Sequence, residues 1–365
     1  MNVKKNESRV SMQMPEGDKC VTTVTMFCKY VTVKAANLNG TERFGTAHAY
    51  RFAAVSFLKF LGGNDIGIHR INAELIKSYE RYLLANNKAN NTISFYMRSL
   101  RSVYNQAIEE KIFKPRKANE KPFSGVFTGY AKTQKRAISA ENVSLLMKLD
   151  EVKQPSLLQS LHLFLFSFYT QGMSFADMAN LKKENIKGDV IRYNRKKTGQ
   201  QITIALLECM KIIIGYYSDF KSDYIFPILR SCEHGSEYEK WKKTASALAA
   251  FNKNLAILAK SAGITARLTS YVARHTWATL ASLEGIPLAT ISKGMGHESE
   301  KTTRIYISQL DFSDVERANR KILSRFTENI SLSKTAHRSW YKGLFHKISS
   351  LQSYKLFDKI SVNMA

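Results

Sequence analysis

The stretch "GMGHESEKTTRIYI", residues 294–307, sets a histidine, His297, nine positions ahead of a tyrosine, Tyr306. The residues between them are polar and rich in threonine, which is not the composition of a core segment. We therefore expect this connector to hold Tyr306 near the surface, where a large substrate can reach it. Taken alone, Tyr306 is one of 17 tyrosines, and a packed aromatic is its ordinary interpretation.

The charge of the chain indicates the kind of partner. The 365 residues carry a formal net charge of +25, which favours a polyanion, and nucleic acid is the first candidate. A hydrophobic content of 44% is typical of globular proteins, and the length allows two domains. The four cysteines are too irregularly spaced for a disulfide scaffold or a zinc ribbon. With no signal peptide and no long apolar run, we expect a soluble, cytoplasmic protein that does not enter a membrane.

The hydrophobic patterns predict a mainly α fold with a small β-sheet, in five segments. The β-branched stretch at residues 20–33 could form a short strand or hairpin. Helical periodicity begins near residue 46, and a lysine-rich stretch with proline and glycine later interrupts it. The apolar run at 156–169 predicts a buried helix, and "DVIRYNRKKTGQQITIAL", residues 189–206, predicts two strands joined by a turn. The predicted segments are an amino-terminal piece (1–40), a helical domain (41–115), a linker (116–138), a second domain (139–326) and a basic, aromatic extension (327–365).

The third helix of the predicted helical domain, at about residues 91–112, places Tyr96, Arg98 and Arg101 among apolar positions. Arg98 and Arg101 are three residues apart and therefore lie near one helix face. Such a face is either solvated or set against phosphates. The net charge of the chain favours the phosphate contact.

Three blocks of the second half occur in a fixed order: "ARHTWAT" with Arg274, "GMGH" with His297, and "TTRIY" with Tyr306. In this order and spacing the chain resembles the tyrosine recombinases, the phage integrase family. The resemblance covers most of residues 139–325, and the helical domain before the linker looks like the family's SAM-like core-binding domain. It implies a mixed α/β catalytic domain after the linker.

The resemblance implies a reaction in which Tyr306 attacks a DNA phosphodiester and forms a 3′-phosphotyrosine link. Arg274 would stabilise the charge on the phosphate oxygens. His297 would donate a hydrogen bond to the phosphate and help to accept the tyrosine proton. Lys197, in the turn between the two strands, matches the lysine that protonates the leaving 5′-oxygen, and its neighbour Lys196 is either the alternative acid or a DNA contact. No metal or nucleotide cofactor is implied.

The chain departs from the family pattern at two positions. Ser174 stands where the family has its first catalytic arginine, and Tyr271 stands where most members have histidine or lysine. We expect Arg195 to supply the missing cation, because residues i and i+2 of a strand share a face, which would set it beside Lys197. The rest of the first block is in place, with Gly172 and with Asp177 where the family has a buttressing glutamate. The serine resembles a branch carried by mobile elements and invertible segments of gut anaerobes.

The family resemblance also implies partners. They are double-stranded recombination sites, further copies of the chain, which form a homotetramer on DNA from monomers or weak oligomers, and a host DNA-bending protein as an optional partner. The carboxyl-terminal extension would dock in cis or on a neighbouring subunit. Two alternatives are a type IB topoisomerase, against which the order of the blocks argues, and an architectural or regulatory DNA-binding protein that has lost cleavage. Inversion, integration and excision stay open, as does a separate arm-site domain.

Overall fold

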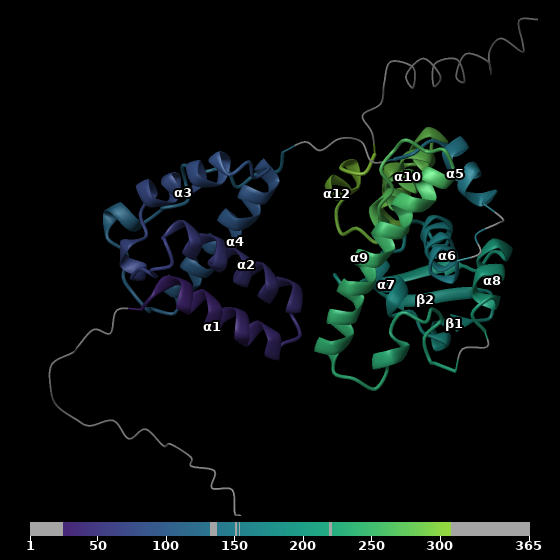
Figure 1. Ribbon diagram of the computed structural model, residues 1–365, viewed down its shortest axis with the longest axis horizontal. Helices are drawn as coiled ribbons and strands as arrows, with labels where there is room; N and C mark the ends of the chain where they lie inside the picture. Colours follow the sequence, from purple (N-terminus) through teal and green to yellow (C-terminus); the bar gives the residue numbers. More distant parts are fainter. Residues whose placement is uncertain (1–24, 132–136, 150–151, 153, 219–220, 308–365) are drawn as a thin grey trace, which may run out of the picture. The chain divides into compact units, whose positions relative to one another are not determined.

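The computed structural model describes residues 25–131, 137–149, 152, 154–218 and 221–307, and these divide into two compact units (Figure 1). The first holds residues up to 131 together with 228–246, and the second holds the remainder. Helices dominate both units, as the hydrophobic patterns predict. In the described residues no helix is long and apolar enough to cross a membrane.

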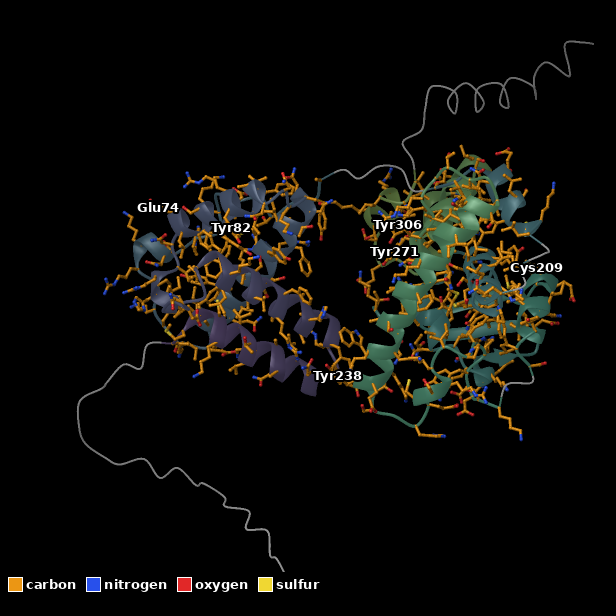
Figure 2. All side chains as sticks on the ribbon, in the orientation of Figure 1. Glu74, Tyr82, Cys209, Tyr238, Tyr271 and Tyr306 are labelled. Atoms are coloured by element: carbon orange, nitrogen blue, oxygen red, sulfur yellow. The ribbon has the colours of Figure 1, made fainter. Side chains whose placement is uncertain are left out.

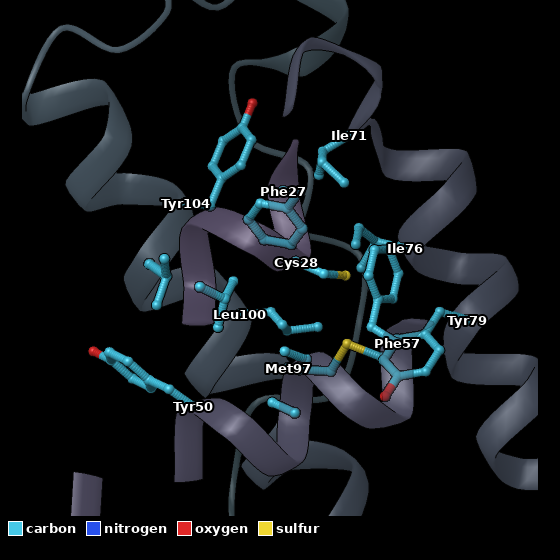
Figure 3. Close-up of a cluster of buried hydrophobic side chains, with 14 of the residues drawn as sticks. Phe27, Cys28, Tyr50, Phe57, Ile71, Ile76, Tyr79, Met97, Leu100 and Tyr104 are labelled. Carbon is cyan, nitrogen blue, oxygen red and sulfur yellow. The ribbon is translucent and has the colours of Figure 1, made fainter. Parts of the chain in front are cut away.

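Four α-helices build the first unit: α1 (Phe27–Gly40), α2 (Phe44–Phe60), α3 (Ala73–Ala85) and α4 (Asn90–Glu109). Short 3₁₀ helices, η1 (Ile68–Arg70) and η2 (Lys117–Asn119), accompany them. The core is aromatic, and Figure 3 shows Phe27, Phe57 and Tyr79 within it. Phe57 meets the other two rings edge-on, with centroids 5.9 Å from Phe27 and 4.9 Å from Tyr79. Edge-to-face pairs of this kind stabilise a core beyond the area that they bury.

Helix α1 contradicts the strand predicted within residues 20–33. From Phe27 onward the chain is helical, and Phe27, Val31 and Ala35 are completely buried at spacings of one helical turn. Burial of this stripe outweighs the β propensity of the valines and threonines, because that propensity is small and depends on context. Helix α1 packs in the same core as α2 and α4, so the helical unit begins before residue 41, where we predicted its start. Residues 20–24 lie outside the described residues.

The predicted linker at 116–138 is also too long. Phe123 and Val126 belong to the core of the first unit. The Tyr104 hydroxyl donates to the backbone oxygen of Asn119, and the buried carboxylate of Glu80 accepts from the backbone N–H of Phe127. Prolines and lysines here mark an irregular segment that is nevertheless packed.

The second unit combines a three-stranded antiparallel sheet with helices. The sheet order is β1 (Ile186–Lys187), β2 (Val190–Asn194) and β3 (Gln201–Ala205). The predicted strand pair is confirmed, with Val190 opposite Ala205 and Asn194 opposite Gln201, whereas β1 was not predicted. The predicted buried helix is α6 (Pro155–Tyr169), which packs against α10 (Ser270–Leu283) and α8 (Glu208–Gly215). The remaining elements of this unit are α5 (Ala140–Met147), α7 (Phe175–Ala179), η3 (Lys183–Asn185), α11 (Leu288–Gly294) and α12 (Glu300–Arg304). The short helix η4 (Arg230–Cys232) is assigned to the first unit, and α9 (Glu237–Ser261) begins in the first unit and ends in the second.

Candidate active site

Arg274 lies at the centre of the candidate site. It is on α10, its side chain is 5% exposed, and its guanidinium donates to three acceptors. Nη1 donates to the backbone oxygen of Gly172 at 2.6 Å, and Nη2 donates to that of Met295 at 2.6 Å and to Nε2 of His297 at 2.8 Å. Burial lowers the pKa of the guanidinium from its usual high value, but arginine stays a cation in proteins. The site therefore holds a fixed, desolvated positive charge.

Gly172 allows this approach. A Cβ at this position would lie 2.6 Å from Cγ and 2.8 Å from Cα of Arg274, which is closer than atoms can come. Its φ of +80° is also one that glycine adopts readily and other residues avoid. A glycine here lets the loop before α7 pass directly over α10.

His297 faces Arg274 through one ring nitrogen and Thr303 through the other. Its Nδ1 lies 2.9 Å from the Thr303 hydroxyl oxygen. Burial, followed by the charges of Arg274, Arg195 and Lys197, lowers the pKa of the imidazole from 6.5 to about 4. The ring is therefore neutral near pH 7, and Nε2, which faces a donor that cannot accept, carries no proton. In this state His297 can accept the tyrosine proton, whereas donation from Nε2 to a phosphate requires a second proton on the ring.

Tyr306 follows α12 in the same chain and lies against these residues, half-buried. Its ring centroid is 5.1 Å from that of His297 and 4.5 Å from that of His275, and the guanidinium carbon of Arg274 is 5.4 Å from it. Tyr271, which Figure 2 also labels, lies in the first turn of α10 and is 46% exposed. The three blocks recognised in the sequence thus meet in space.

Half-buried Ser174 and buried Asp177 form a hydrogen-bonded pair at the start of α7. Ser174 caps the helix: its hydroxyl accepts from the backbone N–H of Asp177 at 3.2 Å and donates to the Asp177 carboxylate at 2.7 Å. The other carboxylate oxygen accepts from the backbone N–H of Lys196 at 2.9 Å. Asp177, 4% exposed, therefore ties α7 to the turn after β2, while Ser174 uses its proton within the protein.

Arg195 reaches the site by a route other than the predicted one. It follows the last residue of β2, and residues 196–198 form a turn, so strand alternation does not apply. Arg195 is 9% exposed, whereas Lys196 and Lys197 are exposed. Its Nη1 donates to the backbone oxygen of Gly296, and its Nε lies 3.9 Å from the Asp177 carboxylate without a hydrogen-bond partner among the described residues.

The predicted DNA-contacting residues lie on α4 of the first unit. The guanidinium of Arg98 lies over the ring of Tyr130, 4.6 Å from its centroid, and Arg101 donates a long hydrogen bond of 3.5 Å to Thr128. Tyr96 is half-buried and lines an open hollow of about 380 Å³.

Thr303 is the site residue that sequence reasoning missed. Its side chain is completely buried, although it belongs to a polar connector. The available signal was its six-residue spacing from His297, which predicts no contact by itself because the chain turns between them. Two backbone acceptors, the oxygens of Met295 and Gly296, were likewise invisible in the residue pattern.

Comparisons with known proteins agree with this geometry. A phage integrase SAM-like domain matches residues 26–121, and the phage integrase family domain matches residues 136–311. The first match includes α1, which the structure also places in the core of the first unit. A helical unit followed by a catalytic unit with a tyrosine, histidine and arginine together is the arrangement of a tyrosine recombinase. The chain belongs to the phage integrase family.

Individual relatives are distant. The tyrosine recombinase XerA of Saccharolobus solfataricus is 27% identical over 146 residues, which are 40% of this chain and 43% of that protein. The match therefore spans less than half of that relative's length. A lambda integrase tetramer bound to a Holliday junction gives a TM-score of 0.56 at 13% identity, covering 78% of each chain. The Tn1549 transposon integrase in complex with transposon right end DNA gives 0.57 at 15% identity, covering 82% of this chain and 100% of that one. These structures share the fold.

Replacement of Gly172 by alanine should destabilise the protein more than the same change at Gly285. Both glycines have similar φ values, +80° and +76°, but a Cβ at Gly285 would meet nothing within 4 Å. The backbone strain, about 1–2 kcal/mol, is therefore matched. Overpacking against Arg274 should remove about another 1–3 kcal/mol from the free energy of unfolding of Gly172→Ala, as measured by urea denaturation. Equal losses in the two variants would show that α10 accommodates the methyl group.

The lowered pKa of His297 predicts a pH-dependent stability. Below pH 6.5 the unfolded chain takes up a proton on this ring, while the folded chain resists it until about pH 4. Folding stability contributed by the neutral ring is thus lost as the pH falls through this window. His297→Gln should show a shallower fall of the urea midpoint between pH 6.5 and 4.5 than the parent. An exposed histidine gives the control, His234→Gln, whose curve should parallel the parent's; parallel curves for all three proteins would contradict the prediction.

Proposed function

We propose that the protein is a site-specific DNA recombinase that cleaves and rejoins duplex DNA through a 3′-phosphotyrosine intermediate. The observation that carries the proposal is the convergence of Tyr306 on His297 and Arg274 within one chain. The net charge of +25 and the family membership support DNA as the substrate. The DNA-bound states of the lambda and Tn1549 integrases support the same substrate.

The cleavage step needs a nucleophile, a base, cations and an acid. The Tyr306 oxygen attacks phosphorus and gives its proton to Nε2 of His297, while the bond between phosphorus and the 5′-oxygen breaks. The 5′-oxygen takes a proton from Lys197. Arg274 stabilises the charge that develops on the non-bridging oxygens, because it is desolvated and already oriented. Rejoining reverses these transfers, so no metal or nucleotide is consumed.

Arg195 supplies the second cation in place of the absent first arginine. It is buried, its Nε lacks a hydrogen-bond partner among the described side chains and backbone atoms, and its charge contributes to the lowered pKa of His297. These features support a guanidinium held ready for an anion. Tyr271, exposed at the start of α10, donates one hydrogen bond to the phosphate, and Ser174 acts through Asp177. On the first unit, Tyr96, Arg98 and Arg101 contact the DNA backbone, and Lys196 does so from the turn after β2.

On DNA the protein acts as a homotetramer, assembled from monomers or weak oligomers, with a host DNA-bending protein as a further partner. The tetrameric state of the lambda integrase on a Holliday junction supports this assembly. Ser174 favours the branch of mobile elements and invertible segments, with the protein cytoplasmic and associated with the nucleoid. The carboxyl-terminal extension, residues 327–365, lies outside the described residues, and its docking on this or a neighbouring subunit remains part of the proposal.

Trapping of a covalent intermediate tests the proposed function. The protein is incubated with nicked suicide duplexes from the DNA that flanks its gene, and a denaturing gel shows the adduct. Tyr306→Phe should shift the duplexes as the parent does but form no adduct, because only the nucleophilic oxygen is removed. Duplexes that are shifted by the parent without any adduct would instead favour a DNA-binding protein that has lost cleavage, which the use of the Ser174 proton by Asp177 also suggests.

The role of Arg195 has its own test. Arg195→Ala should slow adduct formation by about 100-fold or more, the loss that follows removal of one donor to a developing charge. Binding of the duplexes should change little. Arg192→Ala, which removes an exposed arginine of β2, is the matched control and should cleave as the parent does. An Arg195→Ala protein that cleaves as fast as the parent, beside an inactive Arg274→Ala, would refute the assignment.

A further inference from the structure

Thr303 is a buried polar residue to which the proposed reaction gives no role. It lies on α12, where Glu300, Lys301, Thr302 and Arg304 are exposed and Thr303 alone has no exposed surface. A buried hydroxyl needs a hydrogen-bond partner, since its desolvation is otherwise unfavourable. The partner of the Thr303 oxygen is Nδ1 of His297, at 2.9 Å.

The hydrogen bonds around His297 identify the proton on its ring. Arg274 carries only donors, so the 2.8 Å contact between Nη2 and Nε2 requires a lone pair on Nε2. The neutral ring then carries its proton on Nδ1 and donates it to the Thr303 hydroxyl. Thr303 and Arg274 together select one of the two neutral tautomers.

Thr303 also forms a backbone hydrogen bond with Tyr306, the proposed nucleophile. The backbone oxygen of Thr303 accepts from the backbone N–H of Tyr306 at 2.9 Å, so the two residues belong to one turn of the chain. The side chain of Thr303 therefore reaches His297 only when the segment that carries Tyr306 is seated against the site. Removal of that segment would take away the acceptor of Nδ1 and the nucleophile together.

We propose that Thr303 is a positioning residue that couples the seating of Tyr306 to the tautomer of His297. When α12 is seated, Nε2 keeps its lone pair, which accepts from Nη2 of Arg274. Once Nη2 turns from the ring to the phosphate, this lone pair takes the proton of the Tyr306 hydroxyl, as the bond from that oxygen to phosphorus forms and the 5′-oxygen leaves with a proton from Lys197. When α12 is displaced, the ring loses the acceptor of its Nδ1–H, and Arg274 alone is left to select the tautomer. A protomer whose tyrosine is withdrawn thereby loses its nucleophile and one of the two groups that hold its base. This inference rests on the proposed function for its catalytic consequence, but not for the tautomer itself.

The first test needs no DNA. Histidine labelled with ¹⁵N in the full chain reports, through long-range ¹H–¹⁵N correlation spectra, which ring nitrogen carries the proton, and His297→Gln identifies the signal. We expect Nδ1–H in the parent, in Thr303→Ser and in the control Thr302→Val, which alters the exposed neighbour on the same helix. In Thr303→Val, which keeps the shape but lacks the hydroxyl, Nδ1–H should no longer be the only form. Thr303→Ala replaces it if the valine variant does not fold. A spectrum unchanged by loss of the hydroxyl would overturn the proposal.

The second test measures adduct formation on the suicide duplexes. Thr303→Val should form adduct at least about 10-fold more slowly than the parent, because the general base is no longer held in its acceptor form. Thr303→Ser should retain most of the rate, and all variants should shift the duplexes equally. A valine variant as fast as the parent would refute the coupling. If the parent itself forms no adduct, the proposed function fails while the spectra still decide the role of Thr303.

Discussion

The buried guanidinium of Arg274 is the interaction on which the site depends. A charge that is 95% removed from water is stable only where its donors are satisfied, and here two backbone oxygens and a ring nitrogen satisfy them. The two oxygens belong to the loop before α7 and to the end of α11, so one side chain fixes three segments that are far apart in the sequence. Its position is consequently set by the fold before any substrate arrives, which is the condition for electrostatic stabilisation of a transition state.

Two glycines make this packing possible. Gly172 lets a loop pass over the backbone of α10, and Gly296 lets the next loop close on Ile202 and Arg195, where a Cβ would lie 2.5 Å and 2.7 Å from side-chain carbons. Both have positive φ values. The backbone oxygen of Gly172 accepts from Arg274, and that of Gly296 accepts from Arg195. Each glycine therefore both allows the close approach and supplies an acceptor to an arginine.

The sequence predicted the parts of this site that depend on spacing. The resemblance carried by the three ordered blocks predicted that Arg274, His297 and Tyr306 share one site, and alternating strands predicted the β2 and β3 pair. It could not predict contacts that depend on how loops pass one another. Arg195 was expected in a strand and instead lies between the end of β2 and the turn at 196–198, and Thr303 is a buried residue within a polar segment. Helix α1 was misassigned because local β preference is weaker than burial of an apolar stripe, which only the neighbouring helices reveal.

The charges of the site explain how one histidine can serve in two steps. Arg274, Arg195 and Lys197 lower the pKa of His297, and among the described residues near them Asp177 is the carboxylate paired with Arg195. The site thus holds an excess of positive charge, which a phosphodiester would offset. A bound phosphate should therefore raise the pKa of His297 toward its ordinary value. The ring would meet the substrate as a proton acceptor and, after taking the tyrosine proton, would become a cation beside the phosphate. In the proposed reaction, acceptance and donation would then be successive states of one residue, and the bound phosphate would drive the change between them.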